Sequence, residues 1–350
     1  MTTIEQRKKR WLEFYDLNSD VNYLYEIYVP YVRKGVAERS KPAFWPELWR
    51  ERIDWILYEY ENKLECCRLL EDDRLPYLTM LTGTDIFAEA FGCWVHRPPD
   101  NRPFALPFVH TAAEAARVKV PRLEDSTLSY LFEMADILRE KAGKDALFKP
   151  VDLQSPMDIA ALIWDKNDLF PAMVEEPEAV KELCCKTHEL LTSFLDEWFR
   201  RYGKTFIAHH PDYYMPYGVT LSEDEAGSVS PEMFEEFFLP HLTALSERYG
   251  QIGIHCCANA MHQWENFKKI PNLRLLNLAQ PDDVIEKAYR VFEGHTCVFM
   301  MGGKRSLPED FSSRTHVVSL FEVDSFDKAV ELGKRLSELS RREEWFAKHN

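Results

Sequence analysis

The segment Gly253-Ile-His-Cys-Cys-Ala-Asn259 places an imidazole and two thiols at the end of a short apolar run. Side chains alternate along a strand, so His255 and Cys257 are expected on one face and Cys256 on the other. Imidazole nitrogen and thiolate sulfur are ligands that tetrahedral zinc prefers. The pair therefore predicts part of a zinc site, although two ligands alone also fit a hydrogen-bonded core histidine beside small buried cysteines.

Further titratable side chains lie in the segment His209-His-Pro-Asp-Tyr-Tyr-Met-Pro216 and in the nearby run Ser222–Glu225. One of the two adjacent histidines is expected to face the site and the other to pack outward. The acidic run either contributes to the site or is a solvated stretch of charge. The side chains expected to complete or support the zinc site are His209, His210, Asp224, Glu225 and Glu322.

These residues need elements that bring them together. From Leu75 onward, short apolar runs alternate with helical periodicity, which is typical of repeated βα units. The expected strands are 76–81, 147–153, 205–208, 251–256, 273–278, 297–301 and 317–323. The expected helices are 126–142, 156–166, 177–201, 231–249, 260–269, 281–292 and 325–341. The pattern predicts an α/β protein with a (β/α)8 TIM barrel over residues 73–350 and a helical extension over residues 1–72.

Seven strands are visible in the sequence, whereas eight close a barrel. The eighth strand is expected to be irregular or to lie within residues 101–110, a segment rich in Pro and Phe. Potential ligands that open a strand are expected at the wrong end of the barrel. Cys297 lies five residues before Gly302, which is roughly 16 Å at about 3.3 Å per residue, and His316 also opens its strand.

In such barrels the residues that follow the strands form the active site. Several polar side chains meet this condition and are expected to line a substrate pocket. They are Asp152, Gln154, Ser155, Asp224 and Asn277. Asp85 follows the first strand, where it is either a catalytic carboxyl group or a helix cap.

Composition narrows the class of protein. Of 350 residues, 45% are hydrophobic and 29% charged, and the formal net charge is −15. Nucleic acid and anionic membranes are disfavoured as partners because phosphates need clustered Lys and Arg. A polyanionic substrate is disfavoured too, although one local arginine cluster would override that argument. No apolar run is long enough to span a membrane and no secretory pattern is present, so a cytoplasmic protein with reduced cysteines is expected.

The sequence His255-x-Cys257-Ala-Asn259 resembles the His-x-Cys-Gly-Asn zinc motif of corrinoid-linked methyltransferases, such as those acting on coenzyme M, within the uroporphyrinogen decarboxylase superfamily. Three further segments resemble the family in order and spacing, over about residues 75–335. They are Asp152-Leu-Gln-Ser-Pro156, similar to a Gly-Pro-Phe/Trp-Thr segment; Val229–Pro240, similar to a Ser-Pro-x-x-Phe-x-x-Phe-x-x-Pro helix; and Val298–Gly303, similar to a Gly-Asn turn.

The resemblance implies a TIM barrel, a zinc ion that activates a substrate thiol, and a partner corrinoid protein that supplies the methyl group. It also implies a tendency to form homodimers. Asp224 fits where the family has an aspartate near its substrate, and Asp85 matches the essential aspartate of the decarboxylases.

Two departures from the family pattern keep alternatives open. The Arg-Gln-Ala-Gly-Arg motif with which the decarboxylases hold carboxylates is absent, and no cysteine follows the last strand, where the methyltransferases have a further ligand. The first alternative is a carboxy-lyase acting on a carboxylated tetrapyrrole or smaller acid, with Asp85 and Tyr213 or Tyr214 near the reaction. The second is a non-catalytic tetrapyrrole or corrinoid binder.

Overall fold

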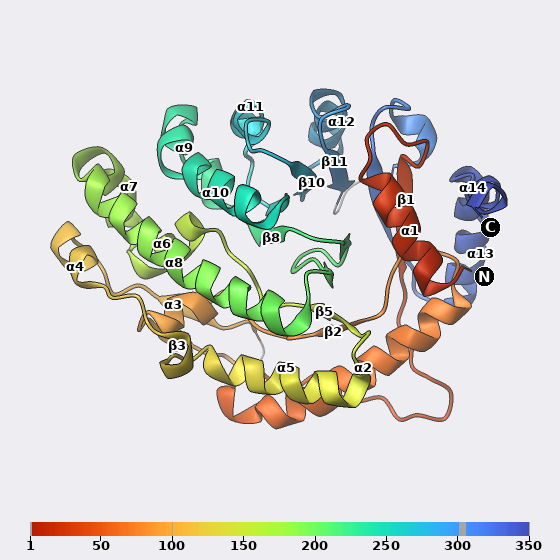
Figure 1. Cartoon of the computed structure of the whole chain (residues 1–350), viewed down its shortest axis with the longest axis horizontal. Helices are drawn as coiled ribbons and strands as arrows, with labels where there is room; N and C mark the ends of the chain where they lie inside the picture. Colours follow the sequence, from red (N-terminus) through yellow and green to blue (C-terminus); the bar gives the residue numbers. More distant parts are fainter. Residues whose placement is uncertain (1, 100, 301–305, 350) are drawn as a thin grey trace.

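The computed structural model describes residues 2–99, 101–300 and 306–349. A group of strands lies at its centre, surrounded by a ring of helices (Figure 1). The longer helices of this ring are α2 (Trp49–Leu69), α5 (Ser129–Ala142), α8 (Pro177–Tyr202), α10 (Leu239–Tyr249), α12 (Asp282–Val291) and α13 (Phe326–Leu339). The shorter helices are α1 (Ile4–Phe14), α3 (Ile86–Ala90), α4 (Ala112–Arg117), α6 (Pro156–Ile163), α7 (Lys166–Glu175), α9 (Pro231–Phe237), α11 (Trp264–Phe267) and α14 (Arg342–His349).

The largest sheet is six-stranded and parallel throughout. Its order is β1 (Tyr23–Tyr28), β12 (Val317–Glu322), β11 (Cys297–Met300), β10 (Leu273–Leu278), β9 (Ile252–Cys256) and β8 (Val219–Ser222). A parallel two-stranded sheet, β2 (Tyr77–Thr79) with β5 (Leu147–Lys149), continues it. The link is a parallel bridge between Gln154 and Ser222, with Ser155 N–H donating to the Ser222 carbonyl at 2.9 Å. Six and two strands together give the predicted (β/α)8 TIM barrel, which confirms the fold class.

The eighth strand is β1, not a segment of residues 101–110. The prediction that residues 1–72 are helical is therefore wrong at Tyr23–Tyr28, which pairs in register with β12. Five of its six residues are buried, so the strand lacks the polar alternation that marks a half-exposed strand in a sequence. The segment 101–110 contributes instead to an antiparallel hairpin, β3 (Trp94–His96) with β4 (Phe104–Leu106).

Two further elements differ from the sequence prediction. The expected strand 205–208 is only β6 (Phe206–Ile207), which forms a hairpin with β7 (Tyr214–Met215), and the barrel strand beside β9 is β8. The expected helix 231–249 is broken at Phe238 into α9 and α10. Pro240 explains this break because a proline lacks the N–H group and disfavours helical geometry in the residue before it.

The seam between β1 and β2 is closed by side chains. Asp73 N–H donates to the Tyr25 carbonyl at 2.9 Å. The N–H groups of Tyr25 and Ile27 donate to the carboxylates of Asp73 and Asp72, at 3.1 and 3.2 Å. Two carboxylates thus satisfy backbone donors that a neighbouring strand would otherwise satisfy.

Arginines surround these two carboxylates, and all but the half-buried Arg74 are fully buried. The ion pairs are Arg7–Asp72 (2.6 Å), Arg74–Asp72 (2.6 Å), Arg10–Asp73 (3.1 Å) and Arg342–Asp73 (2.8 Å). Because Arg342 also donates to the Thr2 hydroxyl at 3.2 Å, the network holds the two ends of the chain together, as the neighbouring N and C labels show (Figure 1).

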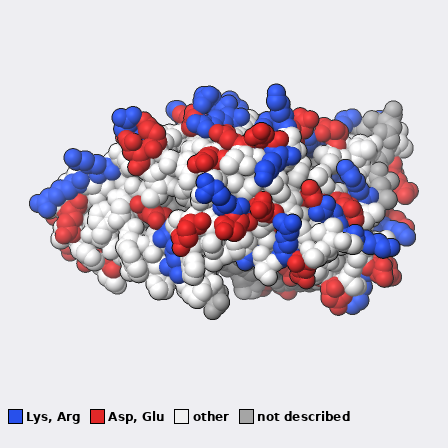
Figure 2. Space-filling model, turned by 90° about the horizontal axis from the view of Figure 1, so that it is seen from below, with Lys and Arg blue, Asp and Glu red and all other residues white. Residues whose placement is uncertain are grey.

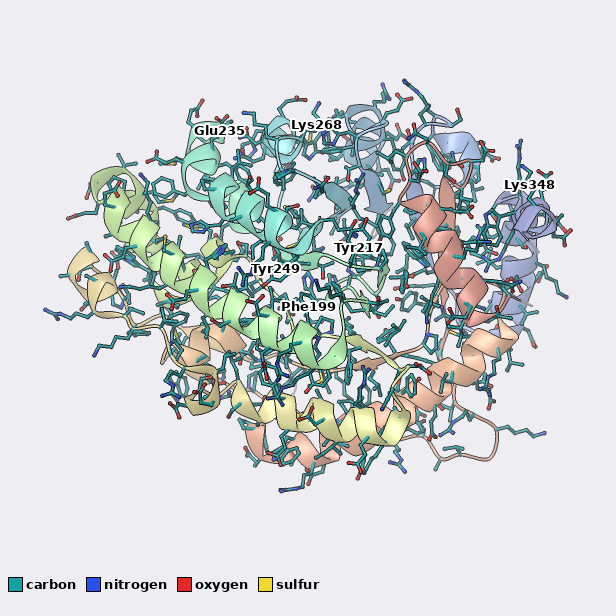
Figure 3. All side chains as sticks on the ribbon, viewed as in Figure 1. Phe199, Tyr217, Glu235, Tyr249, Lys268 and Lys348 are labelled. Atoms are coloured by element: carbon teal, nitrogen blue, oxygen red, sulfur yellow. The ribbon has the colours of Figure 1, made fainter. Side chains whose placement is uncertain are left out.

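Helix α1 covers the end of the barrel where the strands begin. The carbonyl oxygen of Phe14 lies 3.6 Å from Cys297 Sγ and 2.7 Å from His316 Nδ1. This placement confirms that Cys297 and His316 lie at the end of the barrel opposite the expected site. On the outer ring, Phe199 of α8 and Tyr249 of α10 meet edge to face with ring centroids 5.4 Å apart (Figure 3).

The outer surface carries both signs of charge. On the face seen in Figure 2, Lys and Arg are interspersed with Asp and Glu, without a continuous basic surface. Within the described part of the chain, every helix is too short or too polar to cross a membrane.

We expect Asp72→Asn to lower the free energy of unfolding by about 3–5 kcal/mol, because Arg7 and Arg74 would be left buried without their counter-charge. Urea denaturation followed by circular dichroism measures the change. The control is Asp324→Asn, whose exposed carboxylate pairs with Lys328 and should cost far less stability, because exposed ion pairs contribute little. Equal losses in both variants would contradict the role given to Asp72.

Asp72 also sets an expectation for acid stability. Burial raises the pKa of this carboxyl, but Arg74 and Arg7 outweigh burial and hold the pKa below its usual value. The stabilisation is therefore complete above the unfolded-state pKa of about 3.9 and is lost as the pH falls through the lower folded-state pKa. Acid titrations of wild type and Asp72→Asn should converge at low pH, and a constant gap between them would contradict this account.

Candidate metal centre and adjoining cavity

His255 lies near the C-terminal end of β9, paired in register with Asn277 of β10. Its Nδ1 lies 2.5 Å from Asn277 Oδ1, and Asn277 Nδ2 donates to the Phe299 carbonyl at 2.8 Å. Because a carbonyl only accepts, the amide nitrogen must face Phe299 and the amide oxygen must face His255. Nδ1 therefore carries the proton, and Nε2 presents a lone pair to a metal.

Cys257 follows β9 and lies against the loop that begins after β8. Its backbone N–H donates to Asp224 Oδ1 at 2.7 Å. Asp158 of α6 holds this loop in place. Its carboxylate accepts hydrogen bonds from the N–H groups of Asp224 and Glu225, at 2.9 and 3.1 Å. Asp158 thereby positions the aspartate that reaches Cys257.

The ligand atoms of Asp224, His255 and Cys257 all lie within 4.8 Å of one another. They form the one group of three or more possible metal ligands within residues 2–99, 101–300 and 306–349. One oxygen, one nitrogen and one sulfur donor fit zinc, and catalytic zinc sites have three protein ligands with a fourth position open to water or substrate. We call these three residues the metal cluster. Asp224, expected in the substrate pocket, lies in this cluster.

The electrostatics of the cluster favour a cation. Burial, together with Asp224, raises the pKa of the Cys257 thiol to about 12, so the thiol is protonated at neutral pH unless a dication ionises it. Behind the loop, burial together with the charge of Asp224 raises the pKa of Asp158 to about 7. Burial together with Asp158 raises the pKa of Glu223 well above its usual value. At least one of these two carboxyls is therefore protonated at neutral pH.

The two adjacent histidines have different surroundings. The His210 ring meets the His255 ring edge to face, with centroids 4.6 Å apart. His209 is buried, with Nδ1 3.0 Å from the Thr220 hydroxyl and Nε2 3.0 Å from the Ser222 hydroxyl. Both nitrogens of His209 are thus used within the protein, so His209 is the less suited of the two to bind a metal or substrate.

A cavity of about 700 Å³ opens beside the metal cluster, and His210 forms part of its wall. It lies where β1, β2 and β5 end, because Tyr28, Thr79 and Lys149 line it. It is therefore at the barrel end where the sequence placed the site.

Two of the residues expected in a substrate pocket lie at this end of the barrel. Asp152 lines the cavity, and its Oδ1 accepts from Gln154 Nε2 at 2.5 Å. Burial raises the pKa of Asp152. The two side chains thus lie together, as expected for residues on one face of an extended segment.

Other expected site residues have structural roles instead. Ser155 is fully buried as the N-cap of α6 and accepts from Asp158 N–H at 3.0 Å. Tyr213 is fully buried, stacked on Trp11, and its hydroxyl lies so close to Gly253 that any side chain there would collide with it. The interpretation of Tyr213 or Tyr214 as a catalytic group is not supported, since both belong to the core.

The ligand predictions for Glu225 and Glu322 need correction. Glu225 opens a short 3-10 helix that turns its carboxylate away from the metal cluster to an ion pair with Lys166. Glu322 ends β12 as an exposed residue and is not part of the metal cluster. The Gly302-Gly303 turn used in the family resemblance lies outside the described residues.

Asp85 is buried at the start of α3, but its side chain makes no capping hydrogen bond. Burial raises its pKa to about 6, and Arg97 lies 3.9 Å away. The residue is not part of the cavity wall. Asp85 thus stands at the N-cap position of α3 without the hydrogen bond that a capping side chain would make. A catalytic role for Asp85 stays a prediction.

Sequence reasoning missed several polar residues around the cavity. Asp212 forms an ion pair with Lys149 and a hydrogen bond with the Tyr77 hydroxyl. Asp212 belongs to the histidine-containing loop, and this position was a usable signal. Lys149 lies inside the predicted strand 147–153 and was not expected at the strand end, where the structure has it because β5 ends at Lys149. Lys63 comes from α2, and no local pattern in a helix indicates that one lysine reaches the mouth of a barrel.

Comparison with known families agrees with this geometry. The family model described as uroporphyrinogen decarboxylase (URO-D) matches residues 77–302. The chain belongs to the uroporphyrinogen decarboxylase family. No curated protein matches it.

Among solved structures, a methyltransferase from Methanosarcina mazei has the same fold. The TM-score is 0.61 at 13% sequence identity, and the match covers 98% of this chain and 99% of that chain. The likeness therefore extends beyond the family match to the N-terminal segment that contains β1.

Asn277 provides a test of the metal centre. We expect Asn277→Ala to weaken zinc binding roughly 10–100-fold, because His255 loses the partner that fixes its tautomer and ring orientation. Competition against a chromophoric chelator measures the affinity. Asn18→Ala, at an exposed residue between α1 and β1, is the control and should bind zinc as wild type does. Wild-type affinity in Asn277→Ala would contradict the positioning role.

Proposed function

We propose that this protein is a zinc-dependent methyltransferase that moves a methyl group between a corrinoid carried by a partner protein and a thiol or similar acceptor. The observation that carries the proposal is the metal cluster of Asp224, His255 and Cys257, at the barrel end where this fold has its active sites. Membership of the uroporphyrinogen decarboxylase family supports an enzyme, and the fold shared with a methyltransferase agrees with this branch of chemistry.

Each residue has a distinct part in this proposal. Asp224, His255 and Cys257 would hold the ion, and Asn277 keeps Nε2 of His255 free to bind it. A zinc ion held there would lower the pKa of a substrate thiol and supply the thiolate, the stronger nucleophile, at neutral pH. His210 packs on His255 and lines the cavity, so an acceptor bound in the cavity would lie next to the cluster.

The transfer itself is a displacement. The acceptor sulfur forms a bond to the methyl carbon while the cobalt–carbon bond breaks, and the bonding electron pair remains on cobalt.

The test combines metal analysis with a transfer assay. We expect about one zinc per chain and thiol-dependent loss of the methyl–cobalt absorbance of free methylcobalamin. Cys257→Ser and His255→Ala should lose the metal and slow the transfer roughly 100-fold or more, since a catalytic metal contributes several kcal/mol.

Cys185→Ser is the matched control, because Cys185 is the other exposed free cysteine and lies on α8. It should retain both zinc and activity. Transfer at the wild-type rate in metal-free protein or in Cys257→Ser would overturn the proposal.

A second candidate function is decarboxylation of a carboxylated substrate. One observation favours it, namely that Arg39, Arg74 and Arg102 line the cavity, since arginines hold carboxylates in bidentate fashion. Its test is carbon dioxide release from uroporphyrinogen. Release that persists in Cys257→Ser would favour the decarboxylase, and no release by the wild-type protein would exclude it.

A further inference from the structure

Lys63 brings an amine to the wall of the cavity without an ion-pair partner. Helix α2 packs against β2, and Nζ of Lys63 lies 4.1 Å from the centre of the Tyr77 ring, at the start of that strand. Within the described part of the chain, Nζ has neither a carboxylate at ion-pair distance nor a hydrogen-bond acceptor. Its contact is the face of an aromatic ring, in a side chain that lines a cavity.

A second lysine in the same wall shows the contrast. Lys149 forms an ion pair with Asp212, and the Tyr77 hydroxyl donates to the same carboxylate. An ammonium held by a carboxylate stays protonated, so it has no lone pair with which to attack a ligand. Lys63 and Lys149 thus share a cavity, but the ion pair that suppresses the nucleophilicity of an amine is formed by Lys149.

The surroundings of Lys63 favour the unprotonated amine. Burial lowers the pKa of Lys63 to about 8. The acidic groups of Asp212, Glu59 and Cys67 raise the pKa, Lys149 lowers it further, and burial prevails. At pH 7 a pKa of about 8 leaves roughly one amine in ten unprotonated, whereas the usual pKa of about 10.4 leaves fewer than about one in a thousand. Desolvation beside another cation is a recognised way to activate a lysine.

The cavity has room for a ligand that the amine could attack. Its volume of about 700 Å³ is that of a small-molecule site. Phe44, Trp55 and Tyr77 line it, so part of the wall is aromatic and accommodates an apolar carbon skeleton. Lysines of lowered pKa form Schiff bases with carbonyl compounds. The ligand class that fits both the amine and this wall is therefore an aldehyde or a ketone.

We propose that Lys63 is a nucleophilic amine that forms an imine with an aldehyde or ketone bound in this cavity. The amine nitrogen attacks the carbonyl carbon, and the proton that leaves nitrogen moves to the former carbonyl oxygen. The resulting carbinolamine loses water, and the nitrogen lone pair forms the carbon–nitrogen double bond. The reaction consumes no oxidant or reductant and needs no metal, so Lys63 acts independently of the metal cluster.

Reductive trapping tests this reaction. The full-length protein is incubated with benzaldehyde at pH 7, borohydride reduces each imine to a stable secondary amine, and peptide mass spectrometry measures the modification of every lysine. We expect Lys63 to be modified roughly tenfold or more faster than the exposed Lys328 of α13, because more of its amine is unprotonated. Lys149 should react more slowly than Lys63. Equal rates at Lys63 and Lys328, or faster modification of Lys149, would overturn the proposal.

The pH dependence of labelling gives a separate readout. Fluorodinitrobenzene reacts with unprotonated amines, so its rate at each lysine follows the titration of that amine. The rate at Lys63 should level off above about pH 8, in line with its lowered pKa. The rate at Lys328 should continue to rise toward the usual lysine pKa of about 10.4. A profile at Lys63 that matches the profile at Lys328 would contradict the account.

Two substitutions locate the reactive amine. Lys63→Met should abolish the fast phase of benzaldehyde trapping, whereas Lys328→Met should leave it unchanged. Asp212→Asn should speed the reaction of Lys63, since this carboxylate raises its pKa, and should make Lys149 reactive, since Lys149 loses its partner. Thermal melting verifies that each variant is folded. A fast phase that persists in folded Lys63→Met would overturn the proposal.

The Cys257→Ser variant separates this reaction from the proposed methyl transfer. It should lose zinc but retain fast trapping at Lys63, because Cys257 is not part of the cavity wall. Absence of zinc from the wild-type protein, with fast trapping intact, contradicts the proposed methyltransferase and leaves the role of Lys63 standing. Zinc-dependent transfer without preferential trapping at Lys63 has the opposite meaning.

Discussion

Barrel closure depends on two carboxylates that act in place of a strand. Asp72 and Asp73 accept hydrogen bonds from the N–H groups of β1, so β1 joins the barrel without a regular ladder to β2. Buried carboxylates need counter-charge, and the arginines around them supply it from both ends of the chain. Closure then fixes the strand ends on one rim. Residues distant in sequence, such as Asp224 and His255, meet there.

The candidate metal centre is determined by its supporting shell as much as by its ligands. Asn277 determines which nitrogen of His255 is free, and Asp158 holds the loop from which Asp224 reaches the N–H of Cys257. These supports are buried, whereas Cys257 is exposed. The geometry thus combines a fixed imidazole and carboxylate with an accessible sulfur, an arrangement that suits the proposed methyl transfer.

The sequence predicted the features that depend on local pattern. The strands from β9 to β12 and the shared face of His255 and Cys257 followed from alternation and apolar runs. The strand β1 was missed because it is buried on both faces, and its place in the sheet is set by distant aspartates. Glu225 was expected in the site, but its carboxylate pairs with Lys166. The neighbouring residue Asp224 lies in the metal cluster instead.

The cavity cations were the least predictable part, since Lys63 and Arg102 reach the same space from a helix and from a hairpin connection. The periodicity of a single segment cannot predict that side chains from separate elements line the same cavity. Net charge says little about the cavity for a similar reason, because a chain of acidic total charge can gather six Lys and Arg residues around one cavity. Only the closed barrel brings these side chains to one place.

The most direct test of the central claim is a crystal structure of the zinc-loaded protein, with anomalous data collected at the zinc absorption edge. The account predicts a single peak bonded to Nε2 of His255, Sγ of Cys257 and a carboxylate oxygen of Asp224, with one coordination position facing the cavity. A zinc-loaded crystal without a peak between these three atoms, or with zinc bound elsewhere, would contradict it.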